Sequence, residues 1–206
     1  MWDVDGLDKC VEATGDPQLC SYLRQVNQLA DGLVECVKRE SAKVCFNACL
    51  KRCRGERCEE ACLGALEVAT GAAVARELAE GATLAAVLLG ADPVDAVALA
   101  FDTQVKRAEE KDCPDKMVAA RILSIAAIEL YRGFRKVADE KAQDLLMLLA
   151  PAFALAHQCV GEEVFDYLEP IKPIIGEDAT GRIVAALEQG AAVVGDVVIK
   201  FKPVKQ

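Results

Sequence analysis

The sequence has few of the residues that ordinarily carry enzyme chemistry. It contains one histidine, His157, and only three serines and two asparagines in 206 residues. The nucleotide-binding and hydrolase motifs GxGxxG, GxxxxGK[ST] and GxSxG are missing. His157 lies two residues before Cys159, so a helix would place them on different faces and a local Cys–His nucleophile pair is not expected. We therefore expect a protein that is not an enzyme.

Alternation of apolar and polar residues, the mark of a half-buried strand, is almost absent and is weakly visible only at 197–201. The longest strongly apolar run, 145–156, is about half a membrane span and contains Pro151. It predicts a buried core helix and no membrane span. The N-terminus has no basic start and no apolar run, so no signal peptide is visible.

Helical periodicity with clear start and stop signals predicts an all-α fold, an antiparallel bundle of about eight to nine helices. Asp16-Pro17 and Asp92-Pro93 each combine an N-cap with proline at the first helical position, and Ser41 offers a third cap. Gly55 suits the left-handed position after a helix. The expected helices cover 7–13, 17–39, 42–53, 56–80, 83–89, a stretch from 93, a stretch from 114, 162–168 and 178–194, with breaks at Pro170 and Pro173.

Ten cysteines are the most unusual feature of the composition, and five of them lie within 45–62. A chain of this length with 53% hydrophobic residues can bury a core without disulfides, so the bridges need another explanation. Disulfide-rich intracellular proteins occur in hyperthermophiles, and the scarcity of Asn, Ser and His beside 28% charged residues fits that origin. We expect a virion or the cytoplasm of a hyperthermophile as its location, with an extracellular location as the alternative.

Turn positions and cysteine positions together predict the disulfide pairing. Facing residues of an antiparallel hairpin have numbers that sum to twice the turn centre. After Gly133 the chain either turns back near Ala138-Asp139 or continues as one helix to Ala150, and we favour the turn because it centres a fifth bridge on Lys136. The predicted pairs are Cys10–Cys20, Cys36–Cys45, Cys49–Cys62, Cys53–Cys58 and Cys113–Cys159. A competing register, Cys45–Cys62 with Cys49–Cys58, would leave Cys36 and Cys53 at opposite ends of one hairpin.

A zinc site is the alternative use of the central sulfurs. Cys49, Cys53, Cys58 and Cys62 lie at helical spacing, whereas structural zinc sites use short C-x₂₋₄-C turns, often with histidine. An iron–sulfur cluster fits less well, because the usual C-x₂-C runs are missing. We therefore expect no metal or other cofactor.

Charge is unevenly distributed along the chain. The segment 38–57 has seven basic residues against Glu40 and Glu56, a charge of +5 (7 − 2), which leaves −14 (−9 − 5) on the remainder. Such asymmetry suggests an acidic partner, either nucleic acid or the protein's own acidic surface, although a solvated helix face would have the same composition. The candidate anion-binding residues are Lys38, Arg39, Lys43, Lys51, Arg52, Arg54 and Arg57.

These observations predict one helical domain, in which a disulfide-stapled part (1–62) packs on an alanine-rich part (63–206). We expect a non-enzymatic structural or assembly protein that self-associates, such as a capsid, nucleocapsid or filament subunit of a hyperthermophilic archaeon or its virus. The alternative function is a module that binds nucleic acid or another anionic partner through residues 38–57. A metal or thiol protein based on cysteine is the third.

Overall fold

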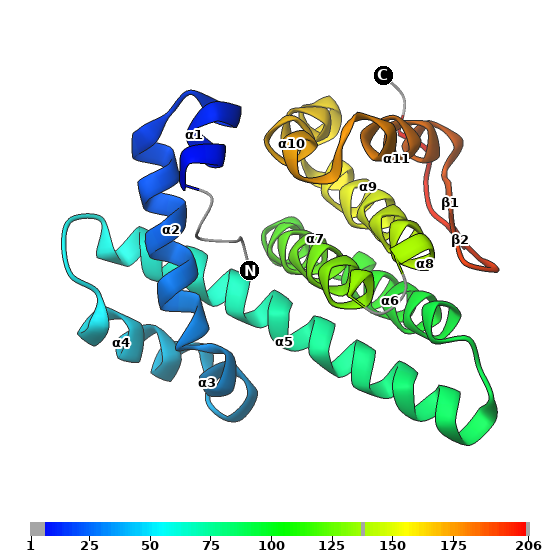
Figure 1. Cartoon of the computed structure of the whole chain (residues 1–206), viewed down its shortest axis with the longest axis horizontal. Coiled ribbons are helices and arrows are strands. Elements are labelled where there is room, and N and C mark those ends of the chain that lie inside the picture. The colour runs from blue at the N-terminus through cyan, green and yellow to red at the C-terminus, as the bar shows by residue number, and fades with distance from the viewer. Residues whose placement is uncertain (1–6, 137–138, 205–206) are drawn as a thin grey trace. The chain divides into compact units, whose positions relative to one another are not determined.

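The protein is a helical, disulfide-rich fold, as predicted. The computed structural model describes residues 7–136 and 139–204, and within them the only strands are those of one C-terminal hairpin. The chain divides into unit 1 (Met1–Ala73) and unit 2 (Val74–Gln206), and the division falls inside one long helix (Figure 1). Each unit has a hydrophobic core of its own. The packing of the two parts into one domain stays a prediction.

Unit 1 is built from α1 (Leu7–Thr14), α2 (Pro17–Asp31), α3 (Val34–Arg39), α4 (Ala42–Arg52) and the first part of α5 (Cys58–Leu89). Two of these helices begin at the predicted caps. The Asp16 carboxylate accepts from the backbone N–H groups of Gln18 and Leu19 at 2.9 and 3.0 Å, and the Ser41 hydroxyl accepts from that of Val44 at 3.4 Å. Both caps satisfy amides that a helix start leaves without partners.

Four disulfides join successive helices of unit 1, and they are the pairs that the turn positions predict. Cys10–Cys20 joins α1 to α2, and Cys36–Cys45 joins α3 to α4. Cys49–Cys62 and Cys53–Cys58 both join α4 to α5. Cys45, Cys49 and Cys62 are buried beside small residues such as Ala61, Ala65 and Ala69, so sulfur occupies the centre of this core.

Unit 2 contains the rest of α5 together with α6 (Pro93–Glu109), α7 (Cys113–Arg135), α8 (Asp139–Leu145), α9 (Leu149–Val160) and α11 (Glu177–Gln189). The chain turns back after α7, and Cys113–Cys159 joins the start of α7 to the end of α9. Val137 and Ala138, in the predicted turn, lie outside the described residues. Shorter helical segments complete the unit: η2 (Leu146–Leu148), η3 (Gly161–Tyr167), η4 (Glu169–Ile171) and α10 (Lys172–Ile175).

The apolar run 145–156 is the centre of unit 2, since every residue in it is buried. The stretch Glu140–Val160 that contains it is long and apolar enough to cross a membrane by length and composition, but 67% of its most apolar window is buried inside the protein. Burial of this kind is what the core helix of a folded domain requires.

Two helix boundaries differ from the prediction. The helix expected over 17–39 is interrupted at Gly32, where Arg52 lies so close that a Cβ would come within 2.7 Å of its Nη1. The helix expected to end at Gly81 continues to Leu89, because a single glycine costs a helix only about 1 kcal/mol. At the predicted breaks, Pro170 and Pro173 stand in the first turns of the short segments η4 and α10, where proline is tolerated.

The last helix was predicted through residue 194, and this is wrong. It ends at Gln189, and Gly190 adopts a left-handed conformation with a φ of 72°. The valine-rich residues that follow form β1 (Ala191–Val194) and β2 (Val197–Lys200), an antiparallel hairpin with Val193 opposite Val198. β-branched residues favour strands, and here Val194 and Ile199 are buried against the helices of unit 2.

Candidate functional site

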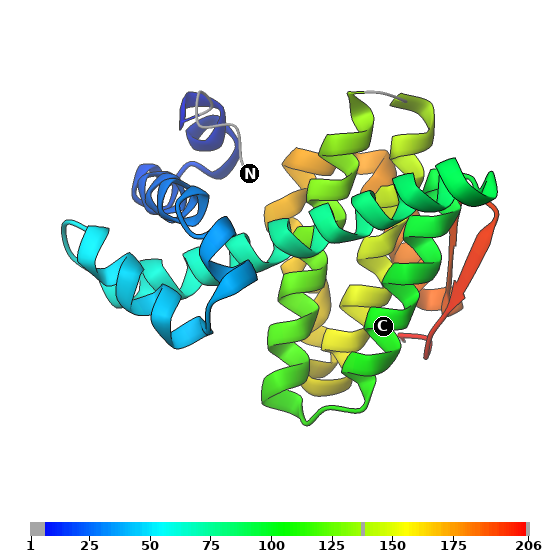
Figure 2. The same ribbon diagram turned by 90° about the horizontal axis from the view of Figure 1, so that it is seen from below.

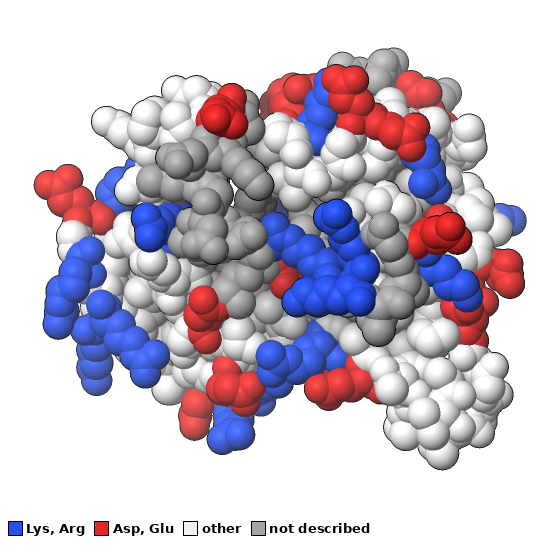
Figure 3. All heavy atoms as spheres, in the orientation of Figure 1, with Lys and Arg blue, Asp and Glu red and all other residues white. Residues whose placement is uncertain are grey.

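The structure separates the predicted basic residues into two groups in unit 1. Lys38, Arg39 and Lys43 lie around the turn between α3 and α4. The others, Lys51, Arg52, Arg54 and Arg57, lie around the turn between α4 and α5. Lys43 and Lys51 are eight residues apart on α4, which is about 12 Å along the helix axis. Figure 3 shows Lys and Arg side chains gathered over α4.

Three of the seven cations are paired with glutamates close to them in sequence. Lys38 Nζ lies 3.3 Å and Arg39 Nη2 lies 3.8 Å from the Glu35 carboxylate. Arg57 Nη2 lies 2.5 Å from Glu60 Oε2, and its guanidinium lies 4.9 Å from the ring centre of Tyr22. Pairs of this kind at the surface are weak, but they reduce the positive field that a phosphate would meet.

Two further cations hold the backbone of unit 1. Arg52 Nη1 donates to the carbonyl of Gly32 at 3.4 Å, at the interruption between α2 and α3. Arg54 Nη1 donates to the carbonyls of Lys51 and Cys53 at 3.4 Å, at the end of α4. Both side chains satisfy carbonyls that helix ends leave open, so their positive charge has a structural explanation.

Lys43 and Lys51 are the two cations of the segment whose side chains have no partner among the described residues. Both are exposed, and in the part of the chain that the structure describes neither side chain has a hydrogen bond or an ion pair. Residues 41–55 contain no acidic residue. The surface that could meet an anion is therefore narrower than the seven residues predicted from sequence.

The cysteines that a zinc site would need are bonded to one another. Cys49, Cys53, Cys58 and Cys62 form two disulfides, and none of the described cysteines is free. Among the described residues, no group of three or more His, Cys, Asp or Glu side chains could hold a metal ion. Cys159 is likewise bonded, to Cys113.

An exposed apolar surface at the end of α5, in unit 2, was not predicted. We call it the apolar tip, and it consists of Leu84 (58% exposed), Val87 (77%), Leu88 (69%) and Leu89 (81%). No charged residue occurs from Gly81 to Ala91. In Figure 3 the region where α5 ends in Figure 1 stands out as an uncharged protrusion. Single exposed leucines are ordinary, whereas a contiguous group marks an interaction surface.

Sequence reasoning missed the tip because its pattern resembles that of a core helix. Spacings of three and four residues between 84, 87 and 88 ordinarily predict a buried face. A signal was nonetheless present, since acidic residues stand on both sides of this uncharged stretch: Glu77 and Glu80 before it, Asp92 and Asp95 after it. No Lys or Arg occurs between Arg76 and Lys106.

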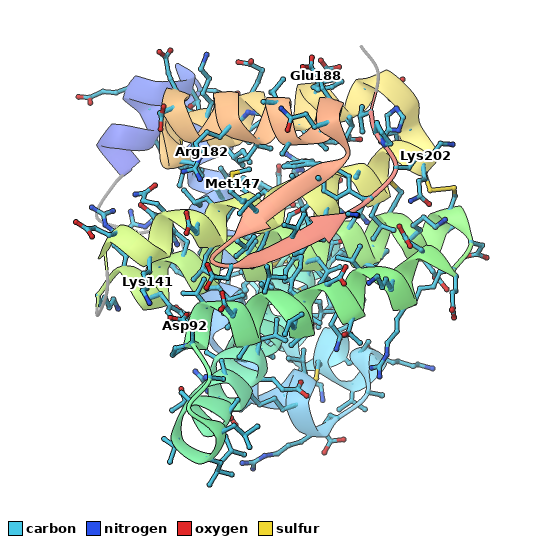
Figure 4. All side chains as sticks on the ribbon, turned by 90° about the vertical axis from the view of Figure 1, so that its right-hand side faces the viewer. Asp92, Lys141, Met147, Arg182, Glu188 and Lys202 are labelled. Atoms are coloured by element: carbon cyan, nitrogen blue, oxygen red, sulfur yellow. A yellow bond between two sulfur atoms is a disulfide. The ribbon has the colours of Figure 1, made fainter. Side chains whose placement is uncertain are left out.

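Two acidic residues hold the start of α6, which follows the tip in the sequence, to other parts of unit 2. Asp92 caps α6 through the N–H of Val94 at 2.9 Å and also forms an ion pair with Lys141 of α8, which it faces in Figure 4. The bond from Lys141 lowers the pKa of Asp92, and the same bond raises the pKa of Lys141. Asp95 accepts from the N–H of Asp196 at 2.8 Å and so ties the hairpin turn to α6.

Unit 2 also contains a hollow of about 460 Å³ beside α6 and α7. Its apolar lining includes Val74, Val118, Ala119, Ile122 and Leu123. Its polar lining includes the exposed side chains of Arg107, Lys111 and Asp115. None of these three side chains has an ion pair among the described residues. The hollow therefore has an apolar floor and a rim of charged side chains that are not neutralised by a direct partner.

No protein-family model, curated protein or solved structure matches this chain. The surfaces of the protein itself are therefore the basis of its proposed function.

Proposed function

We propose that this protein is a non-enzymatic structural subunit that assembles with copies of itself. A capsid, nucleocapsid or filament subunit of a hyperthermophilic archaeon or its virus fits the disulfides and the composition. The observation that carries the proposal is the apolar tip, because it is a contiguous exposed surface that contains no charge. The largest apolar patch on a monomer is commonly about 300–600 Å² and is often a site of interaction, so a patch of this kind indicates where a partner binds.

Burial of the tip supplies a driving force for assembly. Complete burial of a leucine or valine side chain contributes about 1.5–3 kcal/mol. Four such side chains, all more than half exposed, would together contribute several kcal/mol before the entropic cost of association. Disulfides in both units add rigidity, which lowers the conformational entropy that an assembly loses.

Substitution of one tip leucine tests the proposal. Leu84→Asp should reduce the assembly to smaller species, because the contact would have to bury an unpaired carboxylate. Leu99→Asp is the matched control, because Leu99 is also 58% exposed but lies on α6 outside the tip. The measurement is the native mass over a range of protein concentrations, by light scattering and sedimentation, together with an assay for copurified nucleic acid.

Two results would contradict the proposal. One is an unmodified protein that stays a monomer at every concentration. The other is an assembly whose mass is the same in Leu84→Asp as in the unmodified protein.

Binding of an anionic partner is the second candidate, and it is favoured by Lys43 and Lys51 on a segment without acids. If this surface binds duplex DNA, log Kd should change with log salt by about 0.9 for each phosphate contact. The double substitution Lys43→Glu and Lys51→Glu should remove the binding and leave the fold intact, since neither side chain holds the backbone. Lys200→Glu in β2 is the control, and a gel shift without salt dependence would exclude nucleic acid.

A further inference from the structure

The apolar tip is too small to form a stable contact with an identical tip. A stable interface buries about 800 Å² on each partner. The transfer free energies of leucine and valine correspond to about 60–120 Å² for each side chain, so four side chains offer about 240–480 Å². A helix end is also convex, and two convex surfaces touch over only part of their area. The tip therefore needs a concave partner that adds surface around it.

The hollow of unit 2 has the shape and the lining that such a partner requires. It is a concave surface, and aliphatic side chains of α5 and α7 line it. A volume of about 460 Å³ is in the range of pockets that accept several aliphatic groups. Each copy of the chain thus has one surface of each kind.

The charges around the two surfaces are complementary. The tip carries no charge and is flanked by Glu77, Glu80, Asp92 and Asp95, of which Asp92 is paired with Lys141. Glu77 and Glu80 are exposed and have no ion pair among the described residues. The rim of the hollow contains Arg107 and Lys111 against one acid, Asp115. Opposite potentials on facing surfaces favour this orientation over tip against tip, where acids would face acids.

The tip of a chain does not fill the hollow of that chain. The tip precedes the start of α6, whereas Arg107 and Lys111 lie at and beyond its other end, and a helix of 17 residues is about 25 Å long. Figure 2 shows the end of α5 and the connection between α6 and α7 at different sides of unit 2. A contact between two different surfaces at separate places is heterologous, and it continues from copy to copy unless a ring closes.

Building on the proposed self-assembly, we propose that the apolar tip of one copy inserts into the hollow between α6 and α7 of a second copy. The contact joins successive copies head to tail. Leu88 and Leu89 enter the apolar floor, and the acids that flank the tip meet Arg107 and Lys111. The product is a filament or a ring rather than an isolated dimer.

One variant on each surface tests the insertion. Leu88→Asp disables the tip, and Val118→Asp disables the hollow. Both side chains are exposed in the single chain, so both variants should fold, which circular dichroism and thermal unfolding verify. Each variant alone should be a monomer, with a dissociation constant raised about tenfold or more, because each places an unpaired carboxylate in the contact. Val193→Asp, on the exposed face of the hairpin, is the control and should assemble normally.

A mixture of the two variants gives the decisive measurement. The intact tip of Val118→Asp fits the intact hollow of Leu88→Asp, and the two disabled surfaces stop further growth. The mixture should therefore contain a complex of one chain of each kind and nothing larger. A cysteine pair at positions 88 and 122 should crosslink only between chains.

Three other outcomes would overturn the insertion, and the first two would leave self-assembly intact. If Val118→Asp still dimerises while Leu88→Asp does not, the contact is tip against tip. If Val118→Asp assembles fully while Leu84→Asp is a monomer, self-assembly stands and the hollow is not the receptor. Binding of the unmodified monomer to phosphatidylcholine vesicles, lost in Leu88→Asp, would assign the tip to a membrane surface instead.

Discussion

The two units of this protein are stabilised by different means. Unit 1 contains four of the five disulfides, and its core consists largely of cysteine and alanine. Unit 2 contains one disulfide and a core of leucine, isoleucine, phenylalanine and alanine. Among the largest fully buried side chains of the protein, Leu33 alone belongs to unit 1. In the smaller unit, disulfide bonds thus supply stability that large buried apolar side chains supply in unit 2.

The comparison changes the explanation of the cysteines. A chain of 206 residues does not need disulfides to fold, but unit 1 comprises only 73 residues. Cores of this size contribute little net stability, and small domains commonly add disulfides. The density of bridges in unit 1 therefore follows from its size. A hyperthermophilic origin stays a prediction that depends on the remaining composition.

Reduction of the disulfides should have the largest effect on stability. It should destabilise unit 1 far more than unit 2. Each bridge of unit 1 closes a short loop and contributes about 2–3 kcal/mol. Loss of all four would remove about 8–12 kcal/mol, which exceeds the roughly 3–5 kcal/mol that a core of this size supplies. Unit 1 should unfold while unit 2 stays folded. Hydrogen exchange followed by mass spectrometry, with and without reductant, measures this for each helix.

If the amides of α2 and α4 stayed protected from hydrogen exchange after complete reduction, unit 1 would not depend on its disulfides. Peptide mapping without reduction is the matching control, because it establishes the bonds in the starting material. A peptide that links Cys45 to Cys62 would show that the pairing differs from that of the structure.

Truncation of a large core side chain should destabilise unit 2 alone. Phe101 is fully buried, and Phe101→Ala should lower the free energy of unfolding by about 3–5 kcal/mol through lost burial and a cavity. Leu99 on the same helix is exposed, so Leu99→Ala should change the free energy of unfolding by about 0.5 kcal/mol or less. Chemical denaturation measures both. If Phe101→Ala also accelerated hydrogen exchange in α2 and α4, the units would not be independent.

A glycine substitution tests the C-terminal hairpin of unit 2. Gly190→Ala should destabilise by about 1–2 kcal/mol, because left-handed backbone is unfavourable for alanine. Its Cβ would also come within 2.8 Å of the carbonyl oxygen of Phe201. Gly181→Ala is the control, since a Cβ there meets nothing within 4 Å and alanine favours helices. The melting temperature of Gly181→Ala should equal or exceed that of the unmodified protein, and that of Gly190→Ala should be lower.

The ion pair between Asp92 and Lys141 should have the smallest effect on stability, and that effect should depend on pH. The bond from Lys141 holds the pKa of Asp92 below 3.8, so its contribution is present above pH 3.8 and is lost as the pH falls through the lowered value. The pKa of Lys141 lies above 10.5, so the same bond contributes below pH 10.5 and is lost as the pH rises through the raised value.

Asp92→Asn separates the charge from the cap. Asparagine still accepts from the N–H of Val94, whereas Asp92→Ala also loses the cap, at a cost of about 1 kcal/mol. The Asn variant should therefore lie between Ala and the unmodified protein at pH 7. Unfolding at pH 7 and at pH 3 measures the difference, and an Asn variant that equals Ala at pH 7 would assign the whole effect to the charge.

The candidate sites were only partly visible in the sequence. The basic residues of 38–57 are evident as a charge run. In the structure, Arg52 and Arg54 donate to backbone carbonyls, whereas the side chains of Lys43 and Lys51 have no partner among the described residues. The sequence shows which residues are charged. It does not show which groups they bind, because an ion pair or a helix cap depends on the geometry of the folded chain. Residues 83–89 were predicted only as a short helix, because exposure also depends on the folded structure.

The features that the sequence by itself determined are local. Asp16, Ser41 and Asp92 cap helices within three residues of themselves, and the bridges of unit 1 join cysteines 5 to 13 residues apart across tight turns. Turn position and helical spacing suffice to predict such contacts, since both are properties of a short segment.

Only the tertiary structure decided the features that depend on what fills the surrounding space. Leucines at helical spacing are buried in 145–156 and exposed at 84–89, because helices of unit 2 surround the first stretch and none of the described helices covers the second. Residues 191–200 form a hairpin because the surface of unit 2 buries Val194 and Ile199, whereas local preference predicted a helix through residue 194 and only a weak strand at 197–201. Burial is a property of the folded chain and not of a pattern, since it depends on elements far away in the sequence.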